Sequence, residues 1–351
     1  MKSGKHIVLL TPGFAESEVD ENCVPPIQSF LKTSATLYPE TSFSIICFQY
    51  PFTKKSYKWN GVNVYPAGGK GKTGLYRIIT WLRVFVYFVK IRSQNKNITI
   101  HALWLTECYF IGILFSKLFN AKLVATVMGQ DAKKGNRYMK ILHNVKADII
   151  CCSKFAADTL KQSHGKECRE IIPFGVYERE YSFEHSAKRK IDVLGVGNLG
   201  PIKRYTIFVK VIAELKKQLP NVYCEILGKG EHRKMLEEQI LRLDLSENIK
   251  LIGEIKRHEV LTKMMEAKML LHTSVYEGQG YVYMEALASG VYVVSFNTGY
   301  IPDNSKTKIC NTESEMVNSI SNILRSDLDF KPVIPITMKE TVTAYRKYYG
   351  N

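Results

Sequence analysis

The chain has 351 residues, which at roughly 100–200 residues per domain predicts two domains. This length excludes a mini-protein that needs disulfides or a metal ion to fold. Hydrophobic residues make up 45% and charged residues 23% of the sequence, values that exclude disorder and fibrous repeats. The formal net charge is +16, with 25 basic and 14 acidic side chains in residues 1–185 and 24 and 19 in the remainder. Such an uneven field attracts polyanions, phosphorylated molecules or an anionic membrane.

Short apolar runs alternate with longer amphipathic segments, which is the pattern of βαβ units in parallel sheets. In the first half, these patterns predict strands at 6–11, 43–48, 98–103, 122–127 and 148–152, and helices at 24–37, 75–92, 106–119, 136–144 and 154–163. The polar segment 177–190 has no periodicity, which is typical of a linker. The second half predicts strands at 191–197, 222–227, 248–252, 268–273 and 291–296, and helices at 203–218, 231–243, 258–266, 280–289 and 337–349.

These elements predict an α/β protein with two Rossmann-like, doubly wound domains. We expect the first domain to comprise residues 1–185 and the second residues 186–332, with a C-terminal segment 333–351 that returns to the first. Ligands of such sheets bind beyond the carboxyl ends of the strands. The functional site is therefore expected in a cleft between two facing domains.

The cysteines and the N-terminus bear on the compartment. Eight cysteines occur without a CxxC pair and mostly in apolar surroundings, so we interpret them as buried side chains in a reducing compartment, the cytoplasm. The first apolar run, after residue 5, is too short for a signal peptide and predicts a strand. The segment 75–92 is the one candidate for a membrane span, but four Lys and Arg residues interrupt it, which makes crossing costly.

The segment 270–290 is the most informative part of the chain. A strand is predicted to end near Thr273, a glycine-bearing loop follows, and a helix begins near Gly280. A helix N-terminus offers free backbone N–H groups and partial positive charge, which suit a diphosphate. Glu277 in the loop and Glu285 in the helix could both point toward such a ligand, one meeting sugar hydroxyls and the other a ribose. The alternative is two solvated glutamates on a surface helix.

Glu277 and Glu285, separated by seven residues, resemble the E-x7-E signature of retaining nucleotide-sugar glycosyltransferases of family 4, which have the GT-B fold. The loop of that family usually reads Glu-Gly-Phe-Gly, and this chain has Gln279 in place of the phenylalanine. A later Gly-Gly-x-x-Glu is represented by 299–303. The resemblance spans nearly the whole chain and is strongest over 191–303.

The resemblance implies roles for individual residues. Catalytic roles would fall to Glu277, Lys203 and Asp131. Donor binding would fall to Glu285, Arg204, Asn198, Gly228, Gly278, Gln279, Gly280 and Tyr281, and the acceptor side would include Gly13 and His101. Asn198 stands where the family has an arginine for the donor diphosphate, a loss for which Arg204 would compensate. Met128 stands where the family has a histidine, which leaves Asp131 as the nearest polar candidate.

The resemblance implies retaining transfer of a sugar from a UDP- or GDP-linked donor to an acceptor hydroxyl, in cell-surface polysaccharide or glycolipid synthesis. Lys203 and the helix N-terminus would stabilise the departing phosphate, with no cofactor and no metal. The alternatives are another GT-B enzyme such as an epimerase, a weakly catalytic nucleotide-binding protein, and an NAD-dependent oxidoreductase. The last rests on the GxGxxG pattern of 195–200, which Pro201 follows immediately.

Residues 51–100 contain ten Lys and Arg and no acidic residue. No helix-turn-helix, zinc finger or RNA-binding signature accompanies this charge, so we expect no nucleic acid partner. Basic and aromatic residues alternate over 75–92, which is typical of helices that lie on anionic membranes, although such a helix also suits packing on a sheet. The excess charge of the first half predicts an acceptor on a phosphorylated lipid, or peripheral contact with the inner face of the membrane.

Overall fold

The computed structural model describes residues 5–141, 147–181 and 188–350. The chain forms two compact units, the first comprising the chain up to Gly175 and again from Met338, and the second Val176–Thr337. The first unit gives way to the second after Gly175, whereas the boundary predicted at residue 185 lies outside the described residues. Within the second unit, the Val176 N–H donates to the Ile336 carbonyl at 3.1 Å. The C-terminal segment returns to the first unit, as the sequence predicts.

The first unit is built on a sheet in the order β3-β4-β2-β1-β5-β6-β7-β8, parallel except for the antiparallel pair β3–β4. Its strands are β1 (His6–Gly13), β2 (Ser42–Tyr50), β3 (Tyr57–Trp59), β4 (Val62–Pro66), β5 (Ile98–Leu103), β6 (Lys122–Val127), β7 (Asp148–Cys151) and β8 (Glu170–Ile171). Its helices are α1 (Pro25–Leu37), α2 (Leu75–Gln94), α3 (Glu107–Phe119), α4 (Arg137–Ile141), α5 (Lys154–His164) and α11 (Met338–Tyr349). Residues 142–144 of the helix predicted at 136–144 lie outside the described residues.

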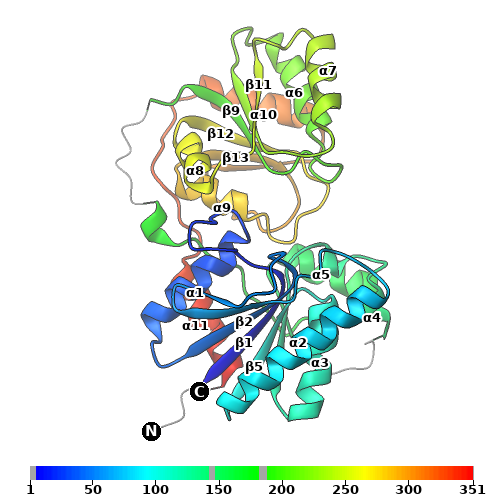
Figure 1. Cartoon of the computed structure of the whole chain (residues 1–351). Helices are drawn as coiled ribbons and strands as arrows, with labels where there is room; N and C mark the ends of the chain where they lie inside the picture. Colours follow the sequence, from blue (N-terminus) through cyan, green and yellow to red (C-terminus); the bar gives the residue numbers. More distant parts are fainter. Residues whose placement is uncertain (1–4, 142–146, 182–187, 351) are drawn as a thin grey trace. The chain divides into compact units, whose positions relative to one another are not determined.

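The C-terminal helix α11 packs on α1 and on the sheet of the first unit (Figure 1). The ring of Tyr345 lies edge-on to that of Phe30, with centroids 5.5 Å apart, and its hydroxyl bonds Thr126 Oγ1 of β6 at 2.9 Å. Helices α2 and α3 are joined to each other by stacking of Phe88 on Phe115, with centroids 4.3 Å apart. Buried aromatic side chains therefore tie the last helix of the chain into the core of the first unit.

The second unit is built on a wholly parallel sheet in the order β11-β10-β9-β12-β13-β14. Its strands are β9 (Ile191–Val196), β10 (Cys224–Leu227), β11 (Ile249–Gly253), β12 (Ala267–His272), β13 (Tyr292–Phe296) and β14 (Thr307–Cys310). Its helices are α6 (Tyr205–Lys216), α7 (Arg233–Arg242), α8 (Arg257–Met265), α9 (Tyr281–Ala288) and α10 (Glu313–Arg325). The order is that of a doubly wound nucleotide-binding sheet, in which ligands bind where the order reverses, at β9 and β12.

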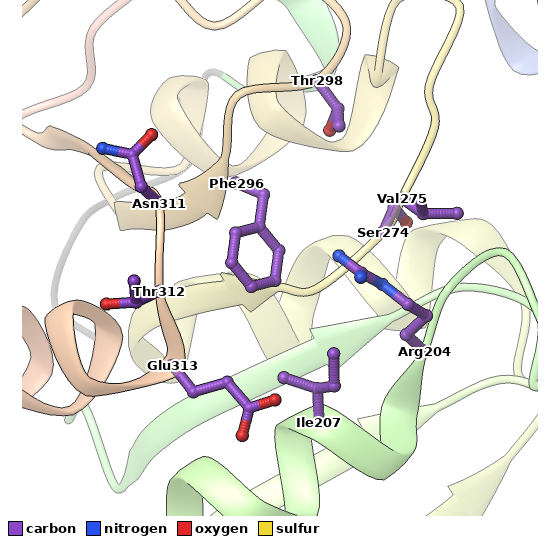
Figure 2. Close-up of a pocket in the computed structure, with 9 residues that line it drawn as sticks. All are labelled: Arg204, Ile207, Ser274, Val275, Phe296, Thr298, Asn311, Thr312 and Glu313. Atoms are coloured by element: carbon purple, nitrogen blue, oxygen red, sulfur yellow. The ribbon is translucent and has the colours of Figure 1, made fainter.

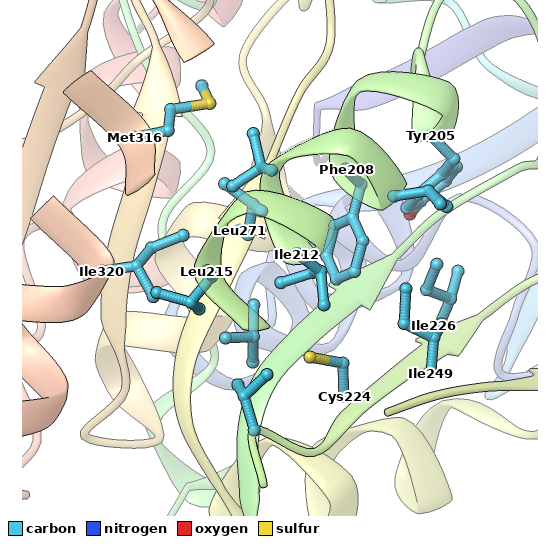
Figure 3. Close-up of a cluster of buried hydrophobic side chains, with 14 of the residues drawn as sticks. Tyr205, Phe208, Ile212, Leu215, Cys224, Ile226, Ile249, Leu271, Met316 and Ile320 are labelled. Carbon is cyan, nitrogen blue, oxygen red and sulfur yellow. The ribbon is translucent and has the colours of Figure 1, made fainter. Parts of the chain in front are cut away.

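Alternate residues of these strands face two separate cores. Met269 and Leu271 of β12 join the cluster formed with α6, α7 and α10 (Figure 3), whereas Leu270 joins the cluster formed with α8 and α9. Because successive strand residues point to opposite faces, helices cover both sides of the sheet. Tyr181, inside the predicted linker, is buried in the second of these clusters.

The predictions did not include the strands β3, β4, β8 and β14 or the helix α10. The hairpin β3–β4 lies within the basic stretch 51–100, and β14 and α10 follow residue 296. The hairpin turns at Asn60 and Gly61, which have φ of 43° and 80°. An Asn-Gly pair between alternating apolar residues is a strong hairpin signal, so the sequence did contain the information. No helix in the described ranges has the length and apolar character needed to cross a membrane.

Candidate functional site

Three neighbouring strands of the second unit end in loops that pack directly on one another. The loop after β9 carries Lys203, and the loop after β10 begins with Gly228, which has a φ of 143°. A Cβ at Gly228 would lie 1.9 Å from the Gly197 carbonyl oxygen, and one at Gly230 would lie 2.4 Å from that of Leu199. Glycines are therefore required here because two backbone segments touch.

The loop after β12 brings Glu277 onto Lys203. Lys203 Nζ lies 2.7 Å from Glu277 Oε1, and the two side chains are 21% and 15% exposed. His272, the last residue of β12, has its Nε2 at 3.3 Å from the same carboxylate oxygen and is 3% exposed. Two residues that the sequence predicted for one site, 74 positions apart, thus form an ion pair at the carboxyl edge of the sheet.

This ion pair keeps Glu277 charged. Burial by itself would raise the pKa of Glu277, but the hydrogen bond from His272 and the charge of Lys203 outweigh it and lower that pKa to about 2. Burial and the neighbouring Lys203 lower the pKa of His272. At neutral pH the site therefore holds a carboxylate and a neutral imidazole.

His272 is oriented by Tyr283 from α9. The Tyr283 hydroxyl lies 2.9 Å from His272 Nδ1 and 3.0 Å from the hydroxyls of both Ser295 and Thr298. When Tyr283 donates to Nδ1, the Nε2 proton of a neutral imidazole is free to bond Glu277. The network thus runs from the interior of the unit to the carboxylate, and no local sequence pattern predicted it.

Helix α9 begins directly after the Glu277 loop. Gly280 precedes it with a φ of 73°, and a Cβ there would lie 2.3 Å from the Tyr283 ring. Tyr281 is the first helical residue. The buried Gln279 accepts a backbone bond from Tyr300 N at 2.6 Å through its carbonyl. Gly278 is buried in the same loop. The structure thus contains the feature predicted to suit a diphosphate, which is a helix N-terminus that follows a glycine-bearing loop.

The second signature carboxylate is held by a cation that the sequence analysis missed. Arg257, the first residue of α8, donates from Nε and Nη2 to Glu285 Oε1 at 3.1 and 2.9 Å. It also donates to Glu180 Oε2 at 2.8 Å and to the Tyr181 hydroxyl at 3.2 Å. Burial raises the pKa of Glu285, and the charge of Arg257 opposes that rise. Glu277 and Glu285 therefore sit in two different ion pairs, each with its own cation.

Arg204 lines a cavity that Lys203 does not line. Its Nε donates to the Thr273 carbonyl at 3.0 Å, and its guanidinium lies 4.8 Å from the centroid of the Phe296 ring. Figure 2 shows both side chains with Glu313 around a cavity of about 460 Å³. Neither Lys203 nor Glu277 lines this cavity. Asn198 is exposed on the β9 loop, and compensation by Arg204 for the arginine missing there stays a prediction.

Asp131, predicted as catalytic, lies in the first unit, as do Gly13 and His101, which were predicted for the acceptor side. Asp131 is buried, and its carboxylate accepts backbone N–H bonds from Leu105 at 2.8 Å and Gly129 at 2.6 Å. Burial raises the pKa of Asp131 and these bonds oppose the rise. Gly13 ends β1, and a Cβ there would meet Tyr50 at 3.4 Å. Asp131 thus fixes the loop after β6, where a carboxylate satisfies buried backbone donors.

His101 is a core residue of the first unit. Its Nδ1 bonds the Tyr349 hydroxyl at 2.8 Å and its Nε2 bonds Thr126 Oγ1 at 2.7 Å. Burial lowers the pKa of His101 to about 3, so the imidazole is neutral. Both nitrogens are used inside the protein, and the residue holds β5 to α11.

Among the described residues no group of three or more His, Cys, Asp or Glu is arranged to hold a metal ion.

A diphosphate at the start of α9 would meet the charge of Lys203 and the N–H groups of that helix. A sugar would meet Glu277, and a ribose at Glu285 would share that carboxylate with Arg257.

The second unit is similar to known proteins in sequence. Residues 178–310 match the protein family described as glycosyl transferases group 1. The gpi3 subunit of phosphatidylinositol N-acetylglucosaminyltransferase from Schizosaccharomyces pombe is 22% identical over 204 residues, which cover 56% of this chain and 45% of that protein. The chain spans less than half the length of the first curated relatives it matches.

The fold is similar to solved structures along nearly its whole length. Sucrose-phosphate synthase from Thermosynechococcus elongatus gives a TM-score of 0.72 at 16% identity, covering 98% of this chain and 96% of that one. HepE from Anabaena, solved in complex with UDP and glucose, gives 0.66 at 17% identity, covering 98% and 95%. The two parallel-sheet units are those of the GT-B fold, as the sequence predicts.

Proposed function

We propose, because the chain belongs to the family of glycosyl transferases group 1, that it transfers a sugar from a nucleoside diphosphate sugar to an acceptor hydroxyl, with retention at the anomeric carbon. The observation that carries this proposal is the ion pair between Lys203 and Glu277 at the start of α9. It puts a cation for phosphate and a carboxylate for sugar side by side, at the edge where ligands of such sheets bind.

Each group has a role that follows from its charge. Lys203 and the first N–H groups of α9 bind the diphosphate and stabilise the negative charge that grows on it as the bond to the anomeric carbon breaks. Glu277 accepts hydrogen bonds from hydroxyls of the donor sugar and faces the positive charge that develops on its ring. A carboxylate with a pKa near 2 remains ionised for this task throughout the neutral range.

The acceptor proton passes to the departing phosphate. The acceptor hydroxyl forms the new bond to the anomeric carbon, the old bond leaves its electron pair on the phosphate oxygen, and that oxygen takes the proton. We prefer this route to a protein base because the Asp131 carboxylate is already engaged by backbone donors. In our proposal Asp131 is therefore a positioning residue, because these hydrogen bonds from backbone N–H groups hold the loop after β6 in place.

The donor we propose is UDP-linked, because HepE was solved with UDP and glucose. Glu285 and Arg257 would meet its ribose, with Gly228 beneath the base. We propose that the acceptor binds the first unit near Gly13 and is a glycan or a lipid-linked hydroxyl, in line with the name of the gpi3 relative. Independence of a metal and a cytoplasmic location stay predictions of the sequence.

Release of UDP from UDP-linked sugars, with GDP-linked sugars in parallel, tests the proposal. Lys203→Ala and Glu277→Gln should each lower turnover by about 100-fold or more. Lys210→Ala, an exposed lysine of α6, is the matched control and should leave turnover unchanged. Wild-type rates in both site variants would refute the assignment. Nucleotide binding without turnover in the wild-type chain would favour the alternative of a nucleotide-binding protein.

A further inference from the structure

Helix α2 of the first unit has two apolar faces. One face packs inward through Val84, Phe88 and Ile91, which are buried. The opposite face is apolar as well, and it is exposed. Its seven large side chains are Leu75, Ile78, Ile79, Leu82, Phe85, Val86 and Val89, with exposures of 37–73%. Their spacing of three or four residues puts them in one stripe along the helix.

The stripe continues onto the neighbouring helix. Phe85 contacts the rings of Phe115 and Phe119 from α3, and α3 exposes Leu114 and Leu118 by 47% and 64%. Single exposed apolar residues are ordinary on protein surfaces. A contiguous group of nine large ones marks a surface that another apolar phase covers. We call these nine residues the α2 face.

Basic side chains surround the α2 face. Lys90 of α2 and Lys117 of α3 are exposed beside it, and Lys70 and Lys72 are exposed just before α2 begins. The only acidic residue of α2 and α3 is Glu107, whose carboxylate is buried and accepts a bond from Trp81 Nε1 at 2.8 Å. An apolar stripe with a cationic rim and no exposed acid is complementary to anionic lipid headgroups above acyl chains.

We propose that the α2 face docks on an anionic lipid bilayer, with α2 lying in the plane of the interface. Charge complementarity favours an anionic bilayer over a second copy of the chain as the partner of this face. A second copy of the chain would bring the same cationic rim against itself, and like charges facing each other disfavour that pairing. The helix cannot instead cross the bilayer, because it carries four basic residues in twenty. This inference does not depend on the proposed sugar transfer.

Flotation of the full chain with vesicles tests the proposal. One set of vesicles contains equal parts of phosphatidylglycerol and phosphatidylcholine, and the other contains phosphatidylcholine alone. The variant Leu82→Ser with Val86→Ser removes two of the most exposed side chains of the stripe, which are 60% and 63% exposed. The matched control is Met235→Ser with Leu241→Ser on α7, two exposed apolar residues of the other unit.

We expect the wild-type chain and the α7 control to float with the anionic vesicles, and less so as salt is added. The stripe variant should bind at least about tenfold more weakly, because each inserted aliphatic side chain contributes favourably to partitioning. Lys90→Glu with Lys117→Glu should weaken binding to anionic vesicles as well.

Three results would overturn the proposal. Wild-type protein that ignores anionic vesicles contradicts it directly, as does a stripe variant that binds as tightly as the α7 control. The third is a wild-type dimer, measured by sedimentation, that the stripe variant converts to a monomer. That result would assign the α2 face to a second copy. Circular dichroism of each variant shows that the fold is kept.

Discussion

The ion pair between Lys203 and Glu277 should make the free energy of unfolding of the second unit depend on pH. The pKa of Glu277 is about 2 in the folded chain against an ordinary value of 4.5. A carboxyl group whose pKa is lowered by folding stabilises the folded state above its unfolded pKa. That stabilisation is lost as the pH falls from 4.5 through 2.

The size of the effect follows from the shift. One pKa unit corresponds to about 1.4 kcal/mol, so the shift corresponds to about 3 kcal/mol at neutral pH. Linkage places about 1.4 kcal/mol of this loss above a pH of about 3.5, where other carboxylates still leave the chain folded. Glu277→Gln keeps the size of the side chain and removes the titration. The stability difference between wild type and variant should therefore shrink by about that amount on going from neutral pH to about 3.5.

The assay is urea unfolding followed by two probes. All three tryptophans, Trp59, Trp81 and Trp104, lie in the first unit, so their fluorescence reports that unit alone, while far-ultraviolet circular dichroism reports both. The variant should alter the circular dichroism transition and leave the tryptophan transition unchanged. A stability difference that is constant with pH would refute the reasoning, because it would show that Glu277 is not held ionised by its partners.

Other substitutions test other contacts. Arg257→Ala should destabilise the second unit by about 3–5 kcal/mol in urea unfolding, since it leaves the buried carboxylate of Glu285 unpaired. Adding Glu285→Gln should recover part of this lost stability. If it recovers none, the Arg257–Glu285 pair is not the cause of the destabilisation. Gly228→Ala should cost about 3 kcal/mol or more through backbone contact, whereas Gly129→Ala, where a Cβ meets nothing within 4 Å, should cost little. Tyr345→Phe should lower the stability of the first unit by about 1 kcal/mol, visible in the tryptophan transition and absent from the second unit.

Local pattern was sufficient for most of the elements. Strands β5 and β6 were predicted to the residue, because a buried parallel strand is a short apolar run between polar loops. The hairpin β3–β4 was missed because its exposed face carries polar residues such as Lys58 and Asn63. The inward Trp59 and Val64 and the Asn-Gly turn marked it nonetheless. A backbone hydrogen bond from the Val176 N–H to the Ile336 carbonyl joins the two ends of the second unit, and no local pattern encodes it.

Part of the excess positive charge of the first half lies on and around helix α2. This helix exposes an apolar face, and the basic side chains surround that face. The sequence by itself determined the alternation of strands and helices and, through the spacing of Glu277 and Glu285, the loop and helix where the site lies. Only the tertiary structure decided the partners, Lys203 for one carboxylate and Arg257 for the other. The physical reason is that these pairs join loops and helices that follow different strands, and the order of strands in the sheet determines which of these segments meet.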